Sequence, residues 1–133
     1  MSNSSILIVG GGIGGLTCAY ALAKKGISTT VLEQANQFRE AGYGILLCPN
    51  VFKVFDRLGI LEPMKAIASF PENLIWMDEP RNLEYMRVPM GKAIVEKFHY
   101  PYGSFHREDL LKVLLDECKK SPLIRLVNAA RVL

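Results

Sequence analysis

A cluster of glycines near the N-terminus constrains the fold of this chain more than any other feature. The run Gly10-Gly11-Gly12-Ile13-Gly14-Gly15 follows the apolar segment 6–9 and precedes a segment with helical periodicity. Glycine has no Cβ, so the backbone can turn sharply there and let an anionic group approach its N–H groups. The apolar segment shows no alternation of polar and apolar residues, which is typical of a strand buried on both faces. The pattern therefore predicts a strand, a tight loop and a helix.

The next segment completes a strand–helix–strand unit. Lys24, Lys25 and Gly26 predict a basic last turn and a C-cap glycine for the helix, and Ile27–Leu32 returns to strand character. Two strands separated by one helix over roughly 30 residues form a βαβ unit with parallel strands. We therefore predict an α/β fold that starts with a Rossmann-like unit and a parallel sheet.

Each position of the glycine pattern has a predicted role in binding a dinucleotide. Gly10 permits the tight turn, Gly12 lets a pyrophosphate come close, and Gly15 lets the helix pack against the strand. The helix N-terminus directs N–H groups and a partial positive charge at the phosphates. Glu33 lies 18 positions beyond Gly15, where a carboxylate binds a ribose diol and disfavours the 2′-phosphate of NADP. NAD and FAD both remain open at this point. The predicted cofactor-binding residues of this unit are Gly10, Gly12, Ile13, Gly14, Gly15, Glu33 and Gln34.

Composition excludes several other classes of function. The 133 residues carry 16 Lys and Arg against 13 Asp and Glu, and no basic run exceeds two residues, so we expect no nucleic-acid partner. The three cysteines form no CxxC pair, which argues against a metal site or a disulfide framework and suits a reducing compartment. The first residues carry no positive side chain, and glycines interrupt the apolar stretch. We therefore expect a cytoplasmic chain without a membrane span.

A second motif carries a resemblance to a known family. The segment Gly42–Asn50 has two glycines two positions apart, then apolar residues, then Pro-Asn, and we expect Asn50 to cap a helix that stops at Gly59. Its predicted apolar face comprises Val51, Val54, Phe55 and Leu58. Together with Gly10–Leu16 and Glu33, this motif resembles the FAD-dependent aromatic hydroxylases, the single-component flavoprotein monooxygenases related to salicylate and p-hydroxybenzoate hydroxylase. The resemblance favours FAD over NAD and implies that Gly44 and Ile45 contact it. Tyr43 departs from the small residue usual in the family.

The resemblance also implies how the middle of the chain is organised. The segments 74–77 and 83–88 read as short strands around a turn-rich stretch. In members of the family, the chain passes at this point from the nucleotide-binding domain into a β-rich substrate domain. We therefore predict that 1–59 and 103–133 form the nucleotide-binding part of an incomplete FAD-binding domain, and that 60–102 is an excursion towards the substrate domain. Five side chains in or near it either line an aromatic pocket or pack in a core or between domains: Trp76, Tyr85, Met86, Met90 and Phe98.

The last third of the chain predicts one more helix and further strands. A helix is expected from Phe105, and the family has an Arg-x-x-Leu-x-x-x-Leu pattern there that Arg107, Leu110 and Leu114 match. The resemblance implies that Arg107 contacts FAD, whereas the residues alone allow a surface ion pair with a nearby acid. Segment 124–127 predicts a third parallel strand, and 131–133 begins another. By the resemblance, Val132 lies beside the adenine.

The implied activity belongs to a protein longer than this chain. The resemblance implies that NAD(P)H, as a transient reductant, and O2 serve to hydroxylate a small aromatic substrate on FAD. No side chain here is assigned as a catalytic residue or a metal ligand. The chain lacks the Asp-Gly and Gly-Asp motifs that follow in the family, so we expect it to be inactive alone and to need a C-terminal portion or self-association. A non-catalytic dinucleotide-binding remnant, or part of another FAD oxidoreductase such as an epoxidase or a reductase, remains open.

Overall fold

The computed structural model describes residues 6–38 and 42–133, which divide into two compact units. The first unit comprises residues up to Tyr43 and from His106 onwards, and the second comprises Gly44–Phe105. In chain order the elements are β1 Ile6–Val9, α1 Ile13–Ala23, β2 Thr29–Leu32, β3 Gly44–Leu47, α2 Pro49–Leu58, α3 Leu61–Ala66, β4 Asn73–Asp78, β5 Leu83–Pro89, α4 Lys92–Phe98, β6 Gly103–His106, α5 Arg107–Lys119 and β7 Ile124–Val127. Each unit is described below by itself.

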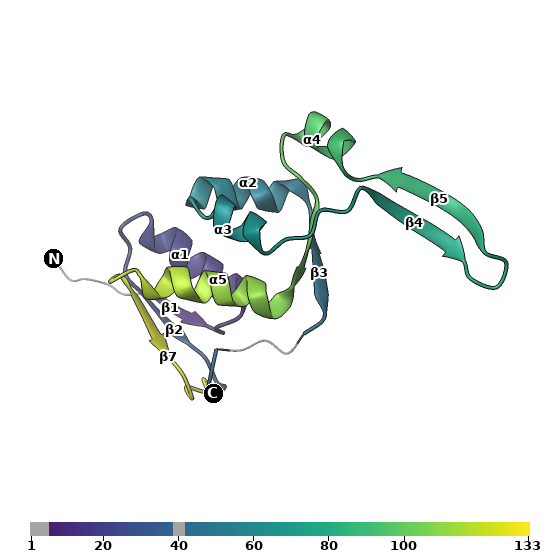
Figure 1. The fold of residues 1–133 in the computed structure, drawn as a ribbon. Helices are drawn as coiled ribbons and strands as arrows, with labels where there is room; N and C mark the ends of the chain where they lie inside the picture. Colours follow the sequence, from purple (N-terminus) through teal and green to yellow (C-terminus); the bar gives the residue numbers. More distant parts are fainter. Residues whose placement is uncertain (1–5, 39–41) are drawn as a thin grey trace. The chain divides into compact units, whose positions relative to one another are not determined.

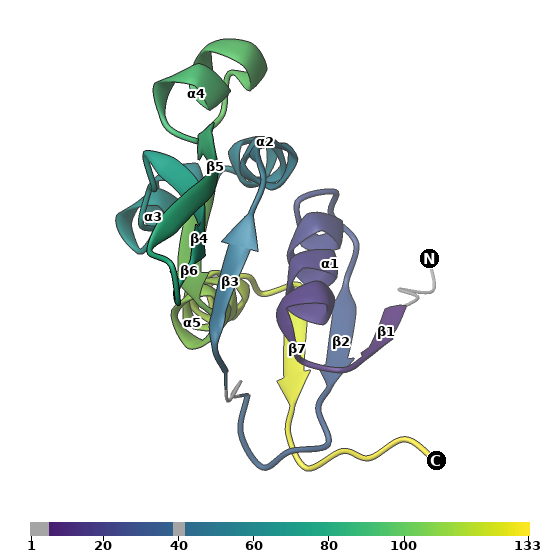
Figure 2. The same ribbon diagram turned by 90° about the vertical axis from the view of Figure 1, so that its right-hand side faces the viewer.

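The first unit is built on a three-stranded parallel sheet in the order β1-β2-β7 (Figure 2). Ile8 of β1 is in register with Val31 of β2, which is in register with Leu126 of β7. Right-handed crossovers in one direction place their helices on the same face of a sheet. Figure 1 shows α1 and α5 side by side on that face. The predicted α/β fold with a parallel sheet is confirmed, including β7 as the third parallel strand.

The core of the first unit lies between the sheet and these two helices. Leu16 and Ala19 of α1, Val31 of β2 and Leu114 of α5 are fully buried. Buried aliphatic side chains of this kind contribute about 1.5–3 kcal/mol each relative to exposure. The buried leucines of α5, Leu110, Leu111 and Leu114, therefore help to hold α5 against α1.

The outer strand β1 is not buried on both faces, which corrects the prediction from its apolar run. Leu7 and Val9 each keep 65% of their surface exposed. Both described helices of this unit cover one face of the sheet, and among the described residues β1 pairs with β2 alone. The apolar run is nevertheless a strand, as predicted, and only its second face is uncovered.

The predicted boundaries of α1 and β2 were wrong by a few residues. The helix ends at Ala23 with Lys24 as its C-cap, so Gly26 is not the C-cap. Gly26 adopts φ +76° and donates its N–H to the carbonyl of Ala23 at 2.9 Å. The N–H of Ile27 is likewise bonded to the carbonyl of Leu22, at 3.0 Å. Ile27 thus belongs to the turn that closes α1, and β2 begins at Thr29.

The second unit combines three helices with two pairs of strands. Strand β3 pairs with β6, and β4 pairs antiparallel with β5. An aromatic cluster forms its core, in which the ring of Phe52 contacts those of Phe55, Phe70 and Phe105 at centroid distances of 6.0, 6.0 and 5.8 Å. Such pairs add about 0.5–1.5 kcal/mol to the burial of the rings.

The helix after the second glycine motif differs from the prediction at its start. Cys48 is the N-cap and Pro49 the first helical residue, so Asn50 lies inside α2. Proline suits the first helical position because its fixed φ fits the helix and its missing N–H would have no intrahelical acceptor. The helix ends at Gly59 with φ +75°, as predicted. Its buried face comprises Phe52, Phe55 and Leu58, whereas Val54 is 43% exposed.

The strands predicted at 74–77 and 83–88 are confirmed as the hairpin of β4 and β5. Its side chains do not pack in a core: Trp76, Tyr85 and Met86 are 46%, 70% and 48% exposed. Met90 is buried, and it lines a cavity of about 360 Å³ together with the half-exposed Phe98. Core packing is therefore wrong for Trp76, Tyr85 and Met86, and an aromatic pocket or packing between domains stays a prediction.

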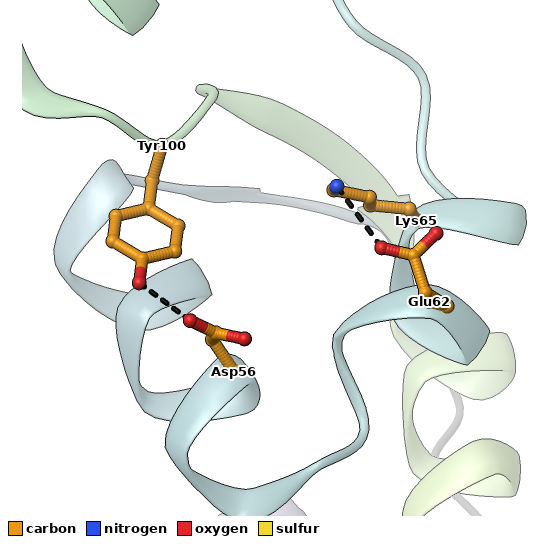
Figure 3. Close-up of polar contacts among 4 residues, drawn as sticks. All are labelled: Asp56, Glu62, Lys65 and Tyr100. Atoms are coloured by element: carbon orange, nitrogen blue, oxygen red, sulfur yellow. Dashed lines mark hydrogen bonds and ion pairs between the residues drawn. The ribbon is translucent and has the colours of Figure 1, made fainter.

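Three elements were not predicted: α3, α4 and β6. Pro63 is the third residue of α3, in the first turn, where a missing N–H costs no helical bond. Phe105 belongs to β6, and α5 begins at Arg107 with His106 as its N-cap. The loop after α4 is tied to α2 by the hydroxyl of Tyr100, which donates to Asp56 at 2.6 Å (Figure 3). On α3, Lys65 pairs with Glu62 at 3.1 Å in the same view.

Candidate dinucleotide-binding site

The site is built around the turn that leaves β1. Gly10 adopts φ +101°, in the left-handed region that only glycine enters without strain, and its N–H donates to the carbonyl of Leu32 at 2.8 Å. This bond continues the β1–β2 pairing by one residue before the chain turns into α1. The predicted role of Gly10 as the residue of the tight turn is confirmed.

Gly15 is required for close packing inside the loop. A Cβ built there would collide with the carbonyl oxygen of Gly10, and it would also lie 3.4 Å from the side chain of Ile8. A side chain at position 15 is therefore excluded chiefly by the backbone of Gly10 in the loop, and less strongly by Ile8 of the strand β1. At Gly14, by contrast, a Cβ would meet no atom within 4 Å. The two glycines of the first helical turn are thus not equivalent.

The start of α1 presents backbone donors without a side-chain cap. Gly12 is the N-cap, in extended conformation, and has no side chain that could accept a hydrogen bond. The first intrahelical bond runs from the N–H of Leu16 to the carbonyl of Gly12, at 3.0 Å. The N–H groups of Ile13, Gly14 and Gly15 precede that bond and so have no intrahelical acceptor. Together with the helix dipole, they make the N-terminus of α1 suited to a phosphate.

Glu33 follows β2 directly and turns its carboxylate back to the glycine loop. One carboxylate oxygen accepts the N–H of Gly11 at 2.7 Å, and the other accepts the N–H of Ala35 at 2.9 Å. The N–H groups of Ala35 and Gly11 lower the pKa of Glu33 below its ordinary value, against a smaller opposing effect of burial. Glu33 is therefore ionised at neutral pH. Gly11 was not among the predicted site residues, although it lies in the same glycine run.

A cavity of about 200 Å³ opens where β1 and β2 end. It brings together four of the predicted residues, Gly10, Glu33, Gln34 and Val132. The sequence did not single out the other three lining residues, Val9, Leu32 and Ala130. Val9 and Leu32 are the last residues of β1 and β2, and ligands of open α/β sheets bind at that end of the strands. The strand ends were thus a usable signal for these two residues.

Val132 reaches the cavity along a path that was not predicted. Residues 131–133 form no strand, which corrects that prediction. Instead the chain after β7 runs beside the segment after β2: Ala129 donates to the carbonyl of Ala35, and Ala130 to that of Glu33, both at 2.9 Å. Ala129 turns the chain with φ +51°. Both residues thus bind the segment that positions the Glu33 carboxylate.

The remaining predicted residues lie outside this cavity. Arg107 is the half-buried first residue of α5, and its side chain lies close enough to Gly42 that a Cβ there would be 3.1 Å from Cδ of Arg107. Gly44 and Ile45 are the first residues of β3, in the second unit. Contact of these three residues with FAD stays a prediction.

Two structural features are absent from residues 6–38 and 42–133. No helix there is long and apolar enough to cross a membrane. Within the same ranges, no three His, Cys, Asp or Glu side chains gather in an arrangement that could hold a metal ion.

Known proteins resemble this chain in sequence and in fold. Residues 8–39 match the family described as NAD(P)-binding Rossmann-like domain. The chain is 38% identical over 130 residues to 3-hydroxybenzoate 6-hydroxylase 1 of Aquipseudomonas alcaligenes. The aligned region covers 98% of this chain and 33% of that protein. The solved structure of p-nitrophenol 4-monooxygenase PnpA from Pseudomonas putida DLL-E4 superposes with a TM-score of 0.86 at 20% identity, over 95% of this chain and 32% of that one.

A second solved structure of similar fold contains FAD. The R204Q variant of HpxO from Klebsiella pneumoniae, complexed with FAD, superposes with a TM-score of 0.78 at 21% identity, over 92% of this chain and 30% of that one. At these identities the structures show the fold alone. The chain spans about a third of the length of the relatives it matches. In sequence, the chain corresponds to the N-terminal portion of FAD-dependent aromatic hydroxylases such as 3-hydroxybenzoate 6-hydroxylase.

Proposed function

We propose that this chain is the FAD-binding region of a flavoprotein monooxygenase that uses NAD(P)H and O2 to hydroxylate a small aromatic molecule. The observation that carries the proposal is the cavity in which Gly10, Glu33 and Gln34 meet beside the start of α1. The relatives that match nearly the whole chain at 34–38% identity are named 3-hydroxybenzoate 6-hydroxylases, which supports the reaction class and the aromatic substrate.

The residues present fit the adenosine and pyrophosphate portion of FAD. The N–H groups of Ile13, Gly14 and Gly15 have no intrahelical acceptor, and a Cβ at Gly14 would meet no atom within 4 Å, so the N-terminus of α1 suits a phosphate. The ionised carboxylate of Glu33 can accept the hydroxyls of a ribose diol, and it repels a 2′-phosphate. The cavity of about 200 Å³ suits one sugar rather than a whole dinucleotide, so the rest of FAD requires other residues. We assign Arg107, Gly44 and Ile45 to that part.

When bound, FAD supplies the redox chemistry that links NAD(P)H and O2 to hydroxylation. The chain itself binds and orients. Glu33 and Gln34 fix the adenosine end, and the first turn of α1 neutralises the pyrophosphate. We assign no proton transfer to a side chain of the described residues.

The cofactor assignment is tested by titrating the 133-residue chain with FAD, with FMN and with NAD, following the quenching of flavin fluorescence or the heat of binding. FAD should bind more tightly than FMN, which lacks the adenosine that Glu33 and the α1 N-terminus recognise. Glu62→Gln, which alters an exposed carboxylate of α3, serves as the control variant and should bind FAD like the wild type. A folded chain that binds NAD but not FAD would contradict the assignment.

The reaction is tested separately from cofactor binding. NADH oxidation is measured with added FAD, with and without 3-hydroxybenzoate and related aromatic acids. Hydroxylated product and substrate-stimulated NADH oxidation are expected only from a polypeptide that also carries the rest of a family member. FAD binding by such a polypeptide without any hydroxylated product would favour a non-catalytic role.

A further inference from the structure

Gly11 has an unusual requirement among the loop residues, because its backbone is buried outside any helix or strand. A buried N–H without an acceptor is costly, so it needs a partner from elsewhere in the fold. The carboxylate of Glu33, 22 residues away, provides it at 2.7 Å. This is a charge-assisted bond, which is stronger than a bond between neutral groups.

The position of the Glu33 carboxylate is fixed from several directions. Its second oxygen is held by the N–H of Ala35 at 2.9 Å. The backbone N–H of Glu33 donates to the carbonyl of Val127 at 2.8 Å. The backbone carbonyl of Glu33 accepts the N–H of Ala130 at 2.9 Å. The ring of Phe38 also lies against Gly11: a Cβ at position 11 would strike this ring and would lie 3.1 Å from Cβ of Glu33. Gly11 therefore packs against the side chains of Phe38 and Glu33 and donates its N–H to the Glu33 carboxylate.

We infer that Glu33 is a positioning residue for the pyrophosphate, because it holds the glycine loop in its anion-binding shape through the N–H of Gly11. This role comes in addition to any contact with a ribose, and it rests on the proposed function of the site. The N–H of Gly11 is then used inside the protein. The donors left for a diphosphate are those at the start of α1, at Ile13, Gly14 and Gly15.

The sign of one effect separates this role from simple electrostatics. Glu33 is negative and stands beside an anion site, so removing its charge should by itself tighten the binding of a diphosphate. If Glu33 holds the loop, the same change should weaken that binding, because the donors are no longer pre-organised. A role limited to the ribose would affect only ligands that carry the diol.

The binding experiment uses ADP and 2′,3′-dideoxy-ADP as probes, with the complete 133-residue chain and its Glu33→Gln variant. We expect Glu33→Gln to weaken both probes, by about tenfold or more, because the amide keeps one acceptor oxygen for the N–H groups of Gly11 and Ala35 and turns an NH2 donor towards the other. Glu62→Gln is the control and should bind both like the wild type. Loss for ADP alone would reduce Glu33 to a ribose contact, and unchanged or tighter binding of dideoxy-ADP would overturn the inference.

A second experiment needs no ligand, so it stands apart from the proposed function. The amide proton shift of Gly11 is followed by NMR as the pH is lowered. It should titrate with the pKa of Glu33, which the N–H groups of Ala35, Gly11 and Gln34 hold below the ordinary value. Amide exchange of Gly11 should be slow, and faster in Glu33→Gln, while that of buried Val31 stays unchanged. A Gly11 shift that does not titrate would overturn the inference even if FAD binds. If this test succeeds and neither FAD nor ADP binds, the proposed function fails instead.

Discussion

The thiol of Cys118 donates to the carbonyl of Leu16 at 3.4 Å, and this contact joins α5 to α1 across 102 positions of sequence. Both residues are fully buried. The carbonyl of Leu16 belongs to the first turns of α1, directly after the glycine loop. The packing of α5 is therefore connected to the element that presents the anion-binding N–H groups.

The three cysteines should differ in reactivity. Burial, and secondarily the charge of Glu117, raise the pKa of Cys118 to about 11, whereas Cys18 and Cys48 are exposed. Because the thiolate is the reactive form, a disulfide reagent at mildly alkaline pH should titrate two thiols rapidly and the third only after denaturation. Cys118→Ala should remove the slow thiol and leave the two rapid ones. Three rapid thiols in the folded chain would contradict the burial of Cys118.

The two glycines of the first helical turn should respond oppositely to alanine. At Gly14 a Cβ meets no atom within 4 Å, so Gly14→Ala should raise the free energy of unfolding by up to about 1 kcal/mol through helix propensity. At Gly15 the Cβ meets the carbonyl of Gly10, so Gly15→Ala should lower it by roughly 1–3 kcal/mol. Urea unfolding of both variants provides the measurement. Equal effects would mean that the loop is not packed against Gly15.

Thr29 should be more stable as valine. Its side chain is 1% exposed, and among the described residues its hydroxyl has no hydrogen-bond partner. Thr29→Val replaces this hydroxyl by a methyl group and should raise the free energy of unfolding by about 1–2 kcal/mol. Thr29→Ser keeps the hydroxyl but loses the methyl group, so it should be destabilising by about 1 kcal/mol. Thermal or urea unfolding decides, and a loss of stability in Thr29→Val would show that the hydroxyl is satisfied.

Tyr100 should ionise at a higher pH than an ordinary tyrosine. Its hydroxyl donates to Asp56, and this hydrogen bond, followed by partial desolvation and the charge of Asp56, raises its pKa above 10.0. The pair contributes stability that is fully present below pH 10 and is lost as the pH rises through the raised pKa. The difference in tyrosinate absorbance between wild type and Tyr100→Phe isolates this group from Tyr20, whose pKa is also raised. Asp56→Asn should return the Tyr100 titration towards 10.0, and an unchanged titration would contradict the bond.

The sequence predicted the first unit well because its signals are local. Gly10 with φ +101° and the strand that ends before Glu33 follow from residue types and their order. The end of α1 and the start of β2 were placed less well. The N–H of Ile27 bonds to the carbonyl of Leu22 in the turn around Gly26, so Ile27 is not part of β2. The bond from Gly11 to Glu33 spans 22 positions, so no local pattern revealed that the carboxylate supports the loop.

The second unit was less predictable because its short elements depend on tertiary contacts. Proline inside a helix usually ends it, yet Pro63 is tolerated in the first turn of α3. Asn50 is a good N-cap by residue type, but Pro49 fits the first helical position and moves the cap to Cys48. The apolar residues at 74–77 and 83–88 correctly predicted the two strands of the hairpin. Which face of a two-stranded hairpin is covered depends on neighbours that no local pattern encodes, and Trp76 is half exposed.

The bare side of β1 has a consequence for handling the chain in water. Leu7 and Val9 present apolar surface along a strand whose outer backbone groups pair with no other described strand. Such an edge is a template for adding further strands, and a net charge of only +3 offers little repulsion between copies. Aggregation should therefore increase with protein concentration and with salt concentration. A charged residue in place of Leu7 should raise the highest protein concentration at which the preparation stays monodisperse.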